Sequence, residues 1–551
     1  MPIADGRALH IRAPAARAAG THGSWAWLPA AAAGLLGLAL YTRTLAPGLT
    51  WAHDGADGGD LLAAALTGGV PHPPGYPTYQ LVLRLVIAVL PSSPARAGNW
   101  VSAICAALAA AFLADLARRM LRQSRRGGCC AAIAALAWAV SPAVWSQAVI
   151  TEVYTLNALF VALLLWILWR WREALLSGRS GRRWLALTAL TFGLGLGNHP
   201  SLGLMLPGAA TWYWSNRRAA GAASNWGWPV ALACLVLGLC VYAYVPLAAS
   251  GNPPVNWGDA RTPAGFWWLV SGQAYRSLVF GIETRYLPAR AFGWASEVLR
   301  QFGWALGALG ALAGLWRLDR QDHAWWQTTG LTALVCTVFA IGYDTTDSYV
   351  YLIPAWSMAA LWLAVGLDWG VRLVDQALVR RRHTFAAAEG VGHPALRGGA
   401  LISTAVMAVL FAAIPGVSVA RYWHQMDLSG DRTAEKYVSD ALADAAPSGV
   451  ILTGSDARTL ALWYALYGLG WRRDLTSVNV HLYGFSWYRQ MLAEHHPGLA
   501  GAISIAEPES IDRFAERAAQ IAPVYRGDAL DMMLPGFVER PAGSLVQLLP
   551  P

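Results

Sequence analysis

Apolar runs long enough to cross a membrane recur along most of this chain. They lie near residues 25–43, 98–117, 128–146, 153–169, 184–197, 201–215, 227–248, 292–316, 325–342, 349–370 and 399–416. A helix needs about 20 mainly apolar residues to cross the hydrocarbon core of a bilayer. Only 13% of the residues are charged, about half the proportion in a soluble domain. The pattern predicts an α-helical polytopic membrane protein with about 11 transmembrane helices, and it excludes a cytosolic enzyme, a disordered chain and a disulfide scaffold.

A twelfth apolar stretch, 77–90, decides the orientation of the chain. Of the 31 basic residues before Gly430, 22 cluster in segments that alternate onto one side of the membrane if this stretch lies along the surface. If it crosses, every later cluster falls on the other side. Arginine beside membrane spans marks the cytoplasmic side, so the stretch is predicted to be a surface helix. The Arg-bearing segment 1–24 is then cytoplasmic, the transmembrane domain is 25–416 with a first outer loop at 44–98, and the C-terminus is outside. The net charge of +9 reflects this topology and predicts no nucleic-acid partner.

The polar C-terminal part, 417–551, reads as a small soluble α/β domain. Strand-like stretches alternate with helical ones: strands are expected at 449–454, 476–483, 501–505, APVYR and SLVQLL, and helices at 456–468, 486–495 and 508–521. No glycine-rich phosphate loop follows any of these strands, so nucleotide binding has no support.

Six of the carboxylates in the segments that this topology places on the outer face are candidate functional groups. These segments are 50–80, 146–159, 195–201, 249–291 and 342–354, and the acids are Asp54, Asp57, Asp60, Glu152, Asp344 and Asp347. Ionisable groups near membrane depth are costly and often functional. Structural alternatives remain for five of them: Asp57 as the N-cap of a helix with Asp60 in its first turn, Glu152 at a helix start, and Asp344 and Asp347 as caps.

Two outer segments also admit a purely structural interpretation. His72-Pro-Pro-Gly-Tyr-Pro has the residues of a rigid turn, which would still deliver His72 and Tyr76 to the outer face. Asn198-His199-Pro200 has the character of a tight turn between helices. No spacing of His, Cys and carboxylates indicates zinc, and scattered carboxylates are weak support for Mg²⁺ or Mn²⁺. No cofactor is therefore predicted, and a divalent metal stays open.

Three motifs together resemble a known family. The loop from Asp57 to Pro77, of the form D-x-G-[ED]-L-x₁₀-HPPGYP, is followed by WSQAVITEVYTLNALF at 145–160 and GLGNHPS at 195–201. The chain resembles a bacterial family related to the transmembrane protein O-mannosyltransferase of animals, within the GT-C glycosyltransferases. Relatives commonly carry D-S-G-E where this chain has Asp57-Gly58-Gly59-Asp60, so the second acid is shorter by one methylene.

The resemblance implies a membrane glycosyltransferase with a GT-C-like catalytic domain. It would move a mannose-like hexose from a polyprenyl-phosphate donor to a hydroxyl of a protein or glycan acceptor, with inversion, on the extracytoplasmic face of the bacterial inner membrane. Asp57 would be the general base, and Asp60 would orient either the acceptor or Asp57. The donor phosphate and sugar would be bound by His72, Tyr76, Glu152, Tyr154, Asn198, His199, Arg276 and Arg285, with secondary contributions from Asp54, Asp344 and Asp347.

A function of a different class stays open on the residues alone. A polytopic transporter or lipid-carrier flippase would also have about a dozen spans with buried charges. Such a protein is expected to carry acids near the middle of its spans and two related halves, and inspection of this sequence finds neither.

Overall fold

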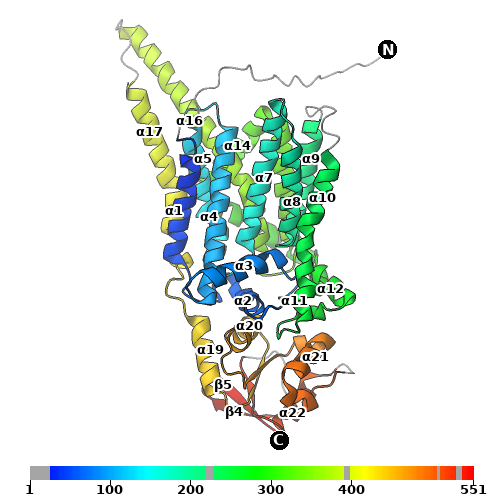
Figure 1. The fold of residues 1–551 in the computed structure, drawn as a ribbon. Coiled ribbons are helices and arrows are strands. Elements are labelled where there is room, and N and C mark those ends of the chain that lie inside the picture. The colour runs from blue at the N-terminus through cyan, green and yellow to red at the C-terminus, as the bar shows by residue number, and fades with distance from the viewer. Residues whose placement is uncertain (1–24, 218–226, 390–396, 506–508, 529–535, 551) are drawn as a thin grey trace.

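The computed structural model describes residues 25–217, 227–389, 397–505, 509–528 and 536–550. A long bundle of helices stands on a smaller α/β domain, which holds the C-terminus (Figure 1). The segment 1–24, predicted to be cytoplasmic, lies outside the described residues.

The bundle follows the predicted apolar runs closely. Its helices are α1 Leu28–Thr44, α4 Pro94–Met120, α5 Gly127–Ala139, α6 Pro142–Ala148, α7 Tyr154–Leu176, α8 Arg182–Leu196, α9 Leu206–Asn216, α10 Gly227–Leu239, α11 Tyr244–Ser250, α14 Ala305–Gln321, α15 His323–Gly342, α16 Ile353–Glu389, α17 Arg397–Phe411 and α18 Val417–Met426. In the described part of the chain, five helices are long and apolar enough to cross a membrane, or up to seven if each bent pair counts as one span. The chain is therefore a helical membrane protein, and the count of eleven spans stays a prediction.

One predicted span is divided by a sharp bend. The run at 292–316 was expected to be a single helix, but α13 (Leu287–Gln301) and α14 meet at an angle of 97°. Gly303 and Trp304 both have positive φ at this corner, a backbone conformation that ends a right-handed helix. α14 packs along α16, whereas α13 makes an angle of 97° with α14 and contacts α15 and α6.

The first outer loop forms two short helices between the bundle and the α/β domain. A 3₁₀ turn, η1 (Ala52–Asp57), leads into α2 (Gly58–Thr67), and α3 follows (Pro77–Val89). In Figure 1, α3 lies across the end of the bundle rather than along it, as predicted for the stretch 77–90.

The α/β domain contains one mixed sheet of five strands in the order β2-β1-β3-β5-β4. The strands are β1 Val450–Thr453, β2 Thr476–Asn479, β3 Val524–Arg526, β4 Val538–Ala542 and β5 Leu545–Leu549. β1 pairs in parallel with β2 and β3, and β5 pairs antiparallel with β3 and β4. The helices are α19 Thr433–Asp444, α20 Asp456–Trp463, α21 Ser486–His495 and α22 Ile511–Ala519.

The strand predicted at 501–505 is wrong, and β4 was not predicted. Side chains take the backbone groups that a strand would offer to its neighbours: Arg517 donates to the carbonyl of Ala502, Arg489 donates to that of Ser504, and Glu509 accepts from the Ser504 N–H. The segment forms a 3₁₀ turn at Pro497–Ala502 instead.

The α/β domain is joined to the bundle through α20, which packs on α2. A Cβ atom at Gly59 would lie 2.4 Å from the Leu460 carbonyl oxygen, so only glycine permits this approach of the two helices. The α/β domain therefore lies directly against the acidic segment of the first outer loop.

Candidate active site

The acidic residues of the first outer loop gather around one histidine. Asp57 ends η1 and Asp60 lies in the first turn of α2, while His72 and Tyr76 belong to the turn between α2 and α3. The Asp60 Oδ2 atom accepts hydrogen bonds from the backbone N–H of His72 at 2.8 Å and from its ring Nδ1 at 2.7 Å. The other ring nitrogen, Nε2, lies 3.1 Å from the Tyr76 hydroxyl and 3.4 Å from Asp57 Oδ2. His72 thus stands between the two carboxylates.

Asp57 and Asp60 differ in their exposure to solvent. Asp60 is fully buried, whereas the side chain of Asp57 is 38% exposed. Asp57 occupies the N-cap position of α2, but its side chain makes no capping hydrogen bond. The capping interpretation of Asp57 is therefore wrong, and its carboxylate is available to a ligand.

The third hydrogen bond to Asp60 comes from Trp257, which lies in a distant loop that the sequence did not connect to this acid. The Trp257 indole N–H donates to Asp60 Oδ1 at 3.0 Å. Val70 holds this loop in place, since its N–H donates to the Val255 carbonyl and its carbonyl accepts from Trp257 N–H. Trp257 lies in the predicted outer segment 249–291, but nothing in that segment indicates which acid this tryptophan would contact.

A second wall of the site is aromatic. The Tyr76 ring centroid lies 5.9 Å from that of His199, and the Tyr154 and Tyr351 centroids each lie 5.7 Å from it. His199 Nδ1 accepts the backbone N–H of Ser201, so the predicted turn at 198–200 is present and fixes the ring. Tyr351 was not predicted as a site residue, although it lies in the outer segment 342–354.

Two buried polar side chains complete this wall. Asn198 is fully buried and donates to the Val153 carbonyl at 3.2 Å, while its Oδ1 atom has no hydrogen-bond partner. Glu152 is 3% exposed, and its Oε2 atom accepts the N–H of Val153 at 3.3 Å. Asn198 leaves an acceptor unsatisfied, which is costly unless a ligand meets it.

The electrostatics of the cluster set its protonation states. Burial lowers the pKa of His72, but the charges of Asp57 and Asp60 outweigh burial and raise it to about 9. Burial raises the pKa of Asp57 to about 6; His72 opposes the rise and Asp456 and other carboxylates add to it. Near neutral pH the cluster therefore holds a cationic imidazole beside a largely ionised Asp57.

Two further groups are driven to their neutral forms. Burial lowers the pKa of His199 to about 4, and the charge of His72 lowers it further. Burial raises the pKa of Glu152 well above its usual range, with Asp57 adding to the rise. Both groups can therefore serve as neutral hydrogen-bonding partners.

The α/β domain adds an acid that the sequence did not single out. Asp456 begins α20, and its charge raises the pKa of Asp57. Burial raises the pKa of Asp456, the charge of His72 lowers it, and that of Asp60 raises it further. The pairing of α20 with α2 brings Asp456 here, and no local sequence signal marks it.

The remaining predicted residues lie at the margin. Asp347 is half-buried, and its charge raises the pKa of Asp57. Asp344 is half-exposed and lies 3.7 Å from Arg290. Asp54 and Arg276 are exposed, and exposed Arg285 pairs with Glu283, two residues before it. Neither arginine has a recorded contact with the acid cluster.

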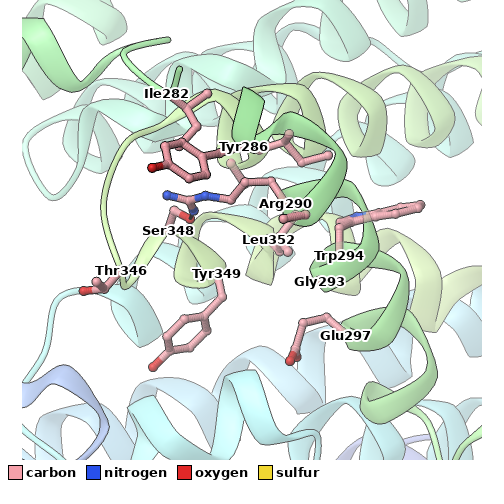
Figure 2. A pocket seen from close by; sticks show the side chains of 13 residues that line it. Ile282, Tyr286, Arg290, Gly293, Trp294, Glu297, Thr346, Ser348, Tyr349 and Leu352 are labelled. Atoms are coloured by element: carbon pink, nitrogen blue, oxygen red, sulfur yellow. Dashed lines mark hydrogen bonds between the residues drawn. The ribbon is translucent and has the colours of Figure 1, made fainter. Parts of the chain in front are cut away.

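A separate cavity of about 500 Å³ lies on the same face. It opens between α13 and the segment 346–352, and its lining includes Tyr286, Arg290, Trp294, Ser348 and Tyr349 (Figure 2). Among the residues that the structure describes, no group of three or more His, Cys, Asp or Glu side chains is placed to hold a metal ion.

Comparison with known proteins identifies relatives of this chain. Residues 57–221 match the family described as Protein O-mannosyl-transferase TMEM260 N-terminal domain. The chain is 26% identical to Protein O-mannosyl-transferase TMEM260 of Mus musculus over 84% of its own length, and 24% identical to the tmem260 protein of Dictyostelium discoideum over 41%. It spans 64% and 28% of the lengths of these relatives.

The fold is also found among solved structures. The crystal structure of ArnT from Cupriavidus metallidurans bound to undecaprenyl phosphate matches 95% of this chain and 98% of its own, with a TM-score of 0.55 and 14% sequence identity. The apo structure of the same protein gives a TM-score of 0.56. Together these matches confirm the family resemblance and the GT-C fold predicted from the three motifs.

Proposed function

Because this chain is a relative of the TMEM260 protein O-mannosyltransferases and has the GT-C fold, we propose that it is a membrane glycosyltransferase. It transfers a mannose-like hexose from a polyprenyl-phosphate donor to a hydroxyl of a protein Ser/Thr or a glycan. The mouse relative is a protein O-mannosyl-transferase, which supports the choice of sugar and acceptor. Binding of undecaprenyl phosphate by ArnT supports a lipid-phosphate donor.

The observation that carries this proposal is the unequal pair of acids on His72. Asp60 is buried, and its three hydrogen bonds come from His72 and Trp257, so it is a positioning residue. Asp57 is exposed enough to meet an acceptor, and its raised pKa of about 6 suits a general base that works near neutral pH.

In the proposed reaction Asp57 takes the proton of the acceptor hydroxyl. The acceptor oxygen then forms a bond to the anomeric carbon while the bond from that carbon to the phosphate oxygen breaks. The bonding electrons leave with the polyprenyl phosphate, which gains negative charge. A single displacement inverts the anomeric configuration, and no covalent sugar–enzyme intermediate is needed.

The other residues bind rather than react. Cationic His72 holds Asp57 in its ionised form, and its positive charge attracts the anionic donor, while its two ring nitrogens face Asp60, Tyr76 and Asp57. Glu152, Tyr154, Asn198 and His199 offer neutral hydrogen-bonding groups and aromatic faces to the sugar, with Tyr76 beside them. Asp54, Asp344 and Asp347 contribute from the periphery.

The distribution of acidic and arginine residues between the two ends of the bundle indicates on which side of the membrane the reaction takes place. The acids lie at the end of the bundle next to the α/β domain, and the arginine-rich ends of α4 and α7 lie at the opposite end (Figure 1). Arginine excess marks the cytoplasmic side. We therefore infer that the active face and the α/β domain, residues 417–551, are extracytoplasmic in a bacterial inner membrane, where the α/β domain meets the acceptor.

The test is a transfer assay with the purified full chain. Polyprenyl-phosphate mannose and a Ser/Thr-containing acceptor peptide are expected to yield a peptide heavier by one hexose, with an anomeric configuration opposite to that of the donor. If no polyprenyl-phosphate hexose supports transfer to any peptide or glycan hydroxyl, the proposed function is wrong.

A further inference from the structure

The cavity beside α13 contains a cation that the proposed reaction has not yet used. Arg290 lines this cavity, and its guanidinium lies beside Ser348 (Figure 2). Its volume of about 500 Å³ falls within the range of about 300–1,000 Å³ typical of small-molecule sites. The cavity is therefore large enough for the polar part of a ligand.

Arg290 is held in position by neutral partners. One terminal nitrogen donates to Ser348 Oγ at 2.6 Å and the other to the Thr345 carbonyl at 2.9 Å. Its nearest acid is Asp344, at 3.7 Å and 47% exposed. A half-exposed acid at this distance neutralises a guanidinium only weakly. Glu297 also lines the cavity, but its carboxylate accepts hydrogen bonds from Arg300 at 2.7 Å and Gln301 at 2.6 Å. The positive charge of Arg290 therefore remains available to an anionic ligand.

Hydrogen bonds through Gln147 link the cavity wall to the segment that precedes Asp57. Tyr349 lines the cavity, and its hydroxyl accepts a hydrogen bond at 3.3 Å from Gln147. The same Gln147 amide donates at 3.2 Å to the carbonyl of His53, in the 3₁₀ turn that ends at Asp57. A ligand anchored at Arg290 can therefore extend toward Asp57.

The other side of the cavity is bounded by a helix suited to a membrane surface. α13 turns by 97° from α14, and it exposes Phe292, Leu299 and Leu287. A helix with one apolar face and a polar opposite face lies in the interface between headgroups and acyl chains. A lipid chain could lie along this face while its headgroup enters the cavity.

We propose that the Arg290 cavity binds the phosphate of the lipid-linked donor, with the prenyl chain along α13 and the sugar directed toward Asp57. This assignment rests on the proposed function, and it gives to Arg290 the role that the sequence suggested for Arg276 and Arg285. A guanidinium can donate two parallel hydrogen bonds to a phosphate. As the anomeric bond breaks, the same charge stabilises the departing phosphate.

The first test measures binding without transfer, using the purified full chain and undecaprenyl phosphate. Arg290→Gln is expected to weaken binding at least tenfold and Arg285→Gln to change it less than twofold. Undecaprenol, which lacks the phosphate, is expected to bind both variants and the wild type equally. Arg285→Gln weakening binding more than Arg290→Gln would overturn the assignment, as would competition by millimolar inorganic phosphate that displaces the lipid completely.

A second variant keeps the assignment falsifiable if Arg290→Gln fails to fold. A Cβ atom at Gly293 meets nothing within 4 Å, and Gly293 lines the cavity, so Gly293→Leu fills the cavity without a clash. Leucine also favours a helix over glycine. Gly330→Leu in α15 is the matched control, since its Cβ also meets nothing within 4 Å and Gly330 does not line this cavity.

We expect Gly293→Leu to lower undecaprenyl phosphate affinity at least tenfold with an unchanged melting temperature, and Gly330→Leu to leave both unchanged. Binding by Gly293→Leu equal to that of the wild type would refute the cavity site. If binding depends on Arg290 but no sugar is transferred by the wild type, the cavity assignment stands and the proposed function fails.

Discussion

The carboxylates at the two ends of the helical bundle have different partners. At the end remote from the α/β domain, Asp115 lies 2.5 Å from Arg118 and 2.6 Å from Arg119, and Asp322 pairs with Arg172. Beside the α/β domain, Asp57 and Asp60 share a single histidine. Acids paired with arginine stabilise the fold, whereas burial beside His72 raises the pKa of Asp57 to about 6. The comparison indicates that the end beside the α/β domain is the one suited to acid–base catalysis.

The largest expected effect belongs to the general base. Asp57→Asn keeps the shape of the side chain and removes its ability to take a proton, so we expect transfer to fall by about 10²–10⁴-fold. Single-turnover assays with saturating donor measure this loss. Asp115→Asn is the matched control from the opposite end, and a loss of similar size in that variant would remove the distinction between the two ends.

The next effect concerns the contact between α2 and α20. Gly59→Val places side-chain atoms against the Leu460 carbonyl, and such overpacking costs about 1–3 kcal/mol. We expect a lower free energy of unfolding in chemical denaturation and slower transfer, because Asp57 and Asp60 flank the displaced segment. Unchanged stability and rate would show that the α/β domain does not support the acidic loop.

The smallest effect is expected at the arginine-rich end. Arg172→Gln removes the partner of Asp322, a pair whose side chains are only 23% and 14% exposed, and losing such a charged hydrogen bond costs about 2 kcal/mol. Denaturant titration should detect this loss, and the transfer rate per folded molecule should match the wild type. A rate reduced more than tenfold would mean that this end also takes part in the reaction.

The sequence predicted the individual motifs of the site better than the contacts between them. Apolar runs located the bundle helices, and the acidic loop, His72 and the turn at 198–200 are where the motifs indicated. Local patterns carry that information because the conformation of each motif depends on residues close to it in the sequence.

What the sequence did not predict depends on long-range packing. Trp257 reaches Asp60 across 197 positions, and Asp456 arrives only because α20 packs on α2. The bend at Gly303 and Trp304 depends on two residues with positive φ, and it sets α13 beside the Arg290 cavity. No periodicity in one segment reveals these contacts.

The central claim is that Asp57 is the general base and that cationic His72, positioned by Asp60, keeps it ionised; the pH dependence of transfer tests this claim most directly. The pKa values of about 6 and about 9 predict a rate that rises as Asp57 ionises near pH 6 and falls as His72 loses its proton near pH 9. The two limbs belong to the pair rather than to either residue alone. Asp60→Asn removes a charge that raises the pKa of His72, so the alkaline limb should move to lower pH. An alkaline limb that Asp60→Asn leaves in place, or a rate that does not change between pH 5 and about 10, would contradict the account.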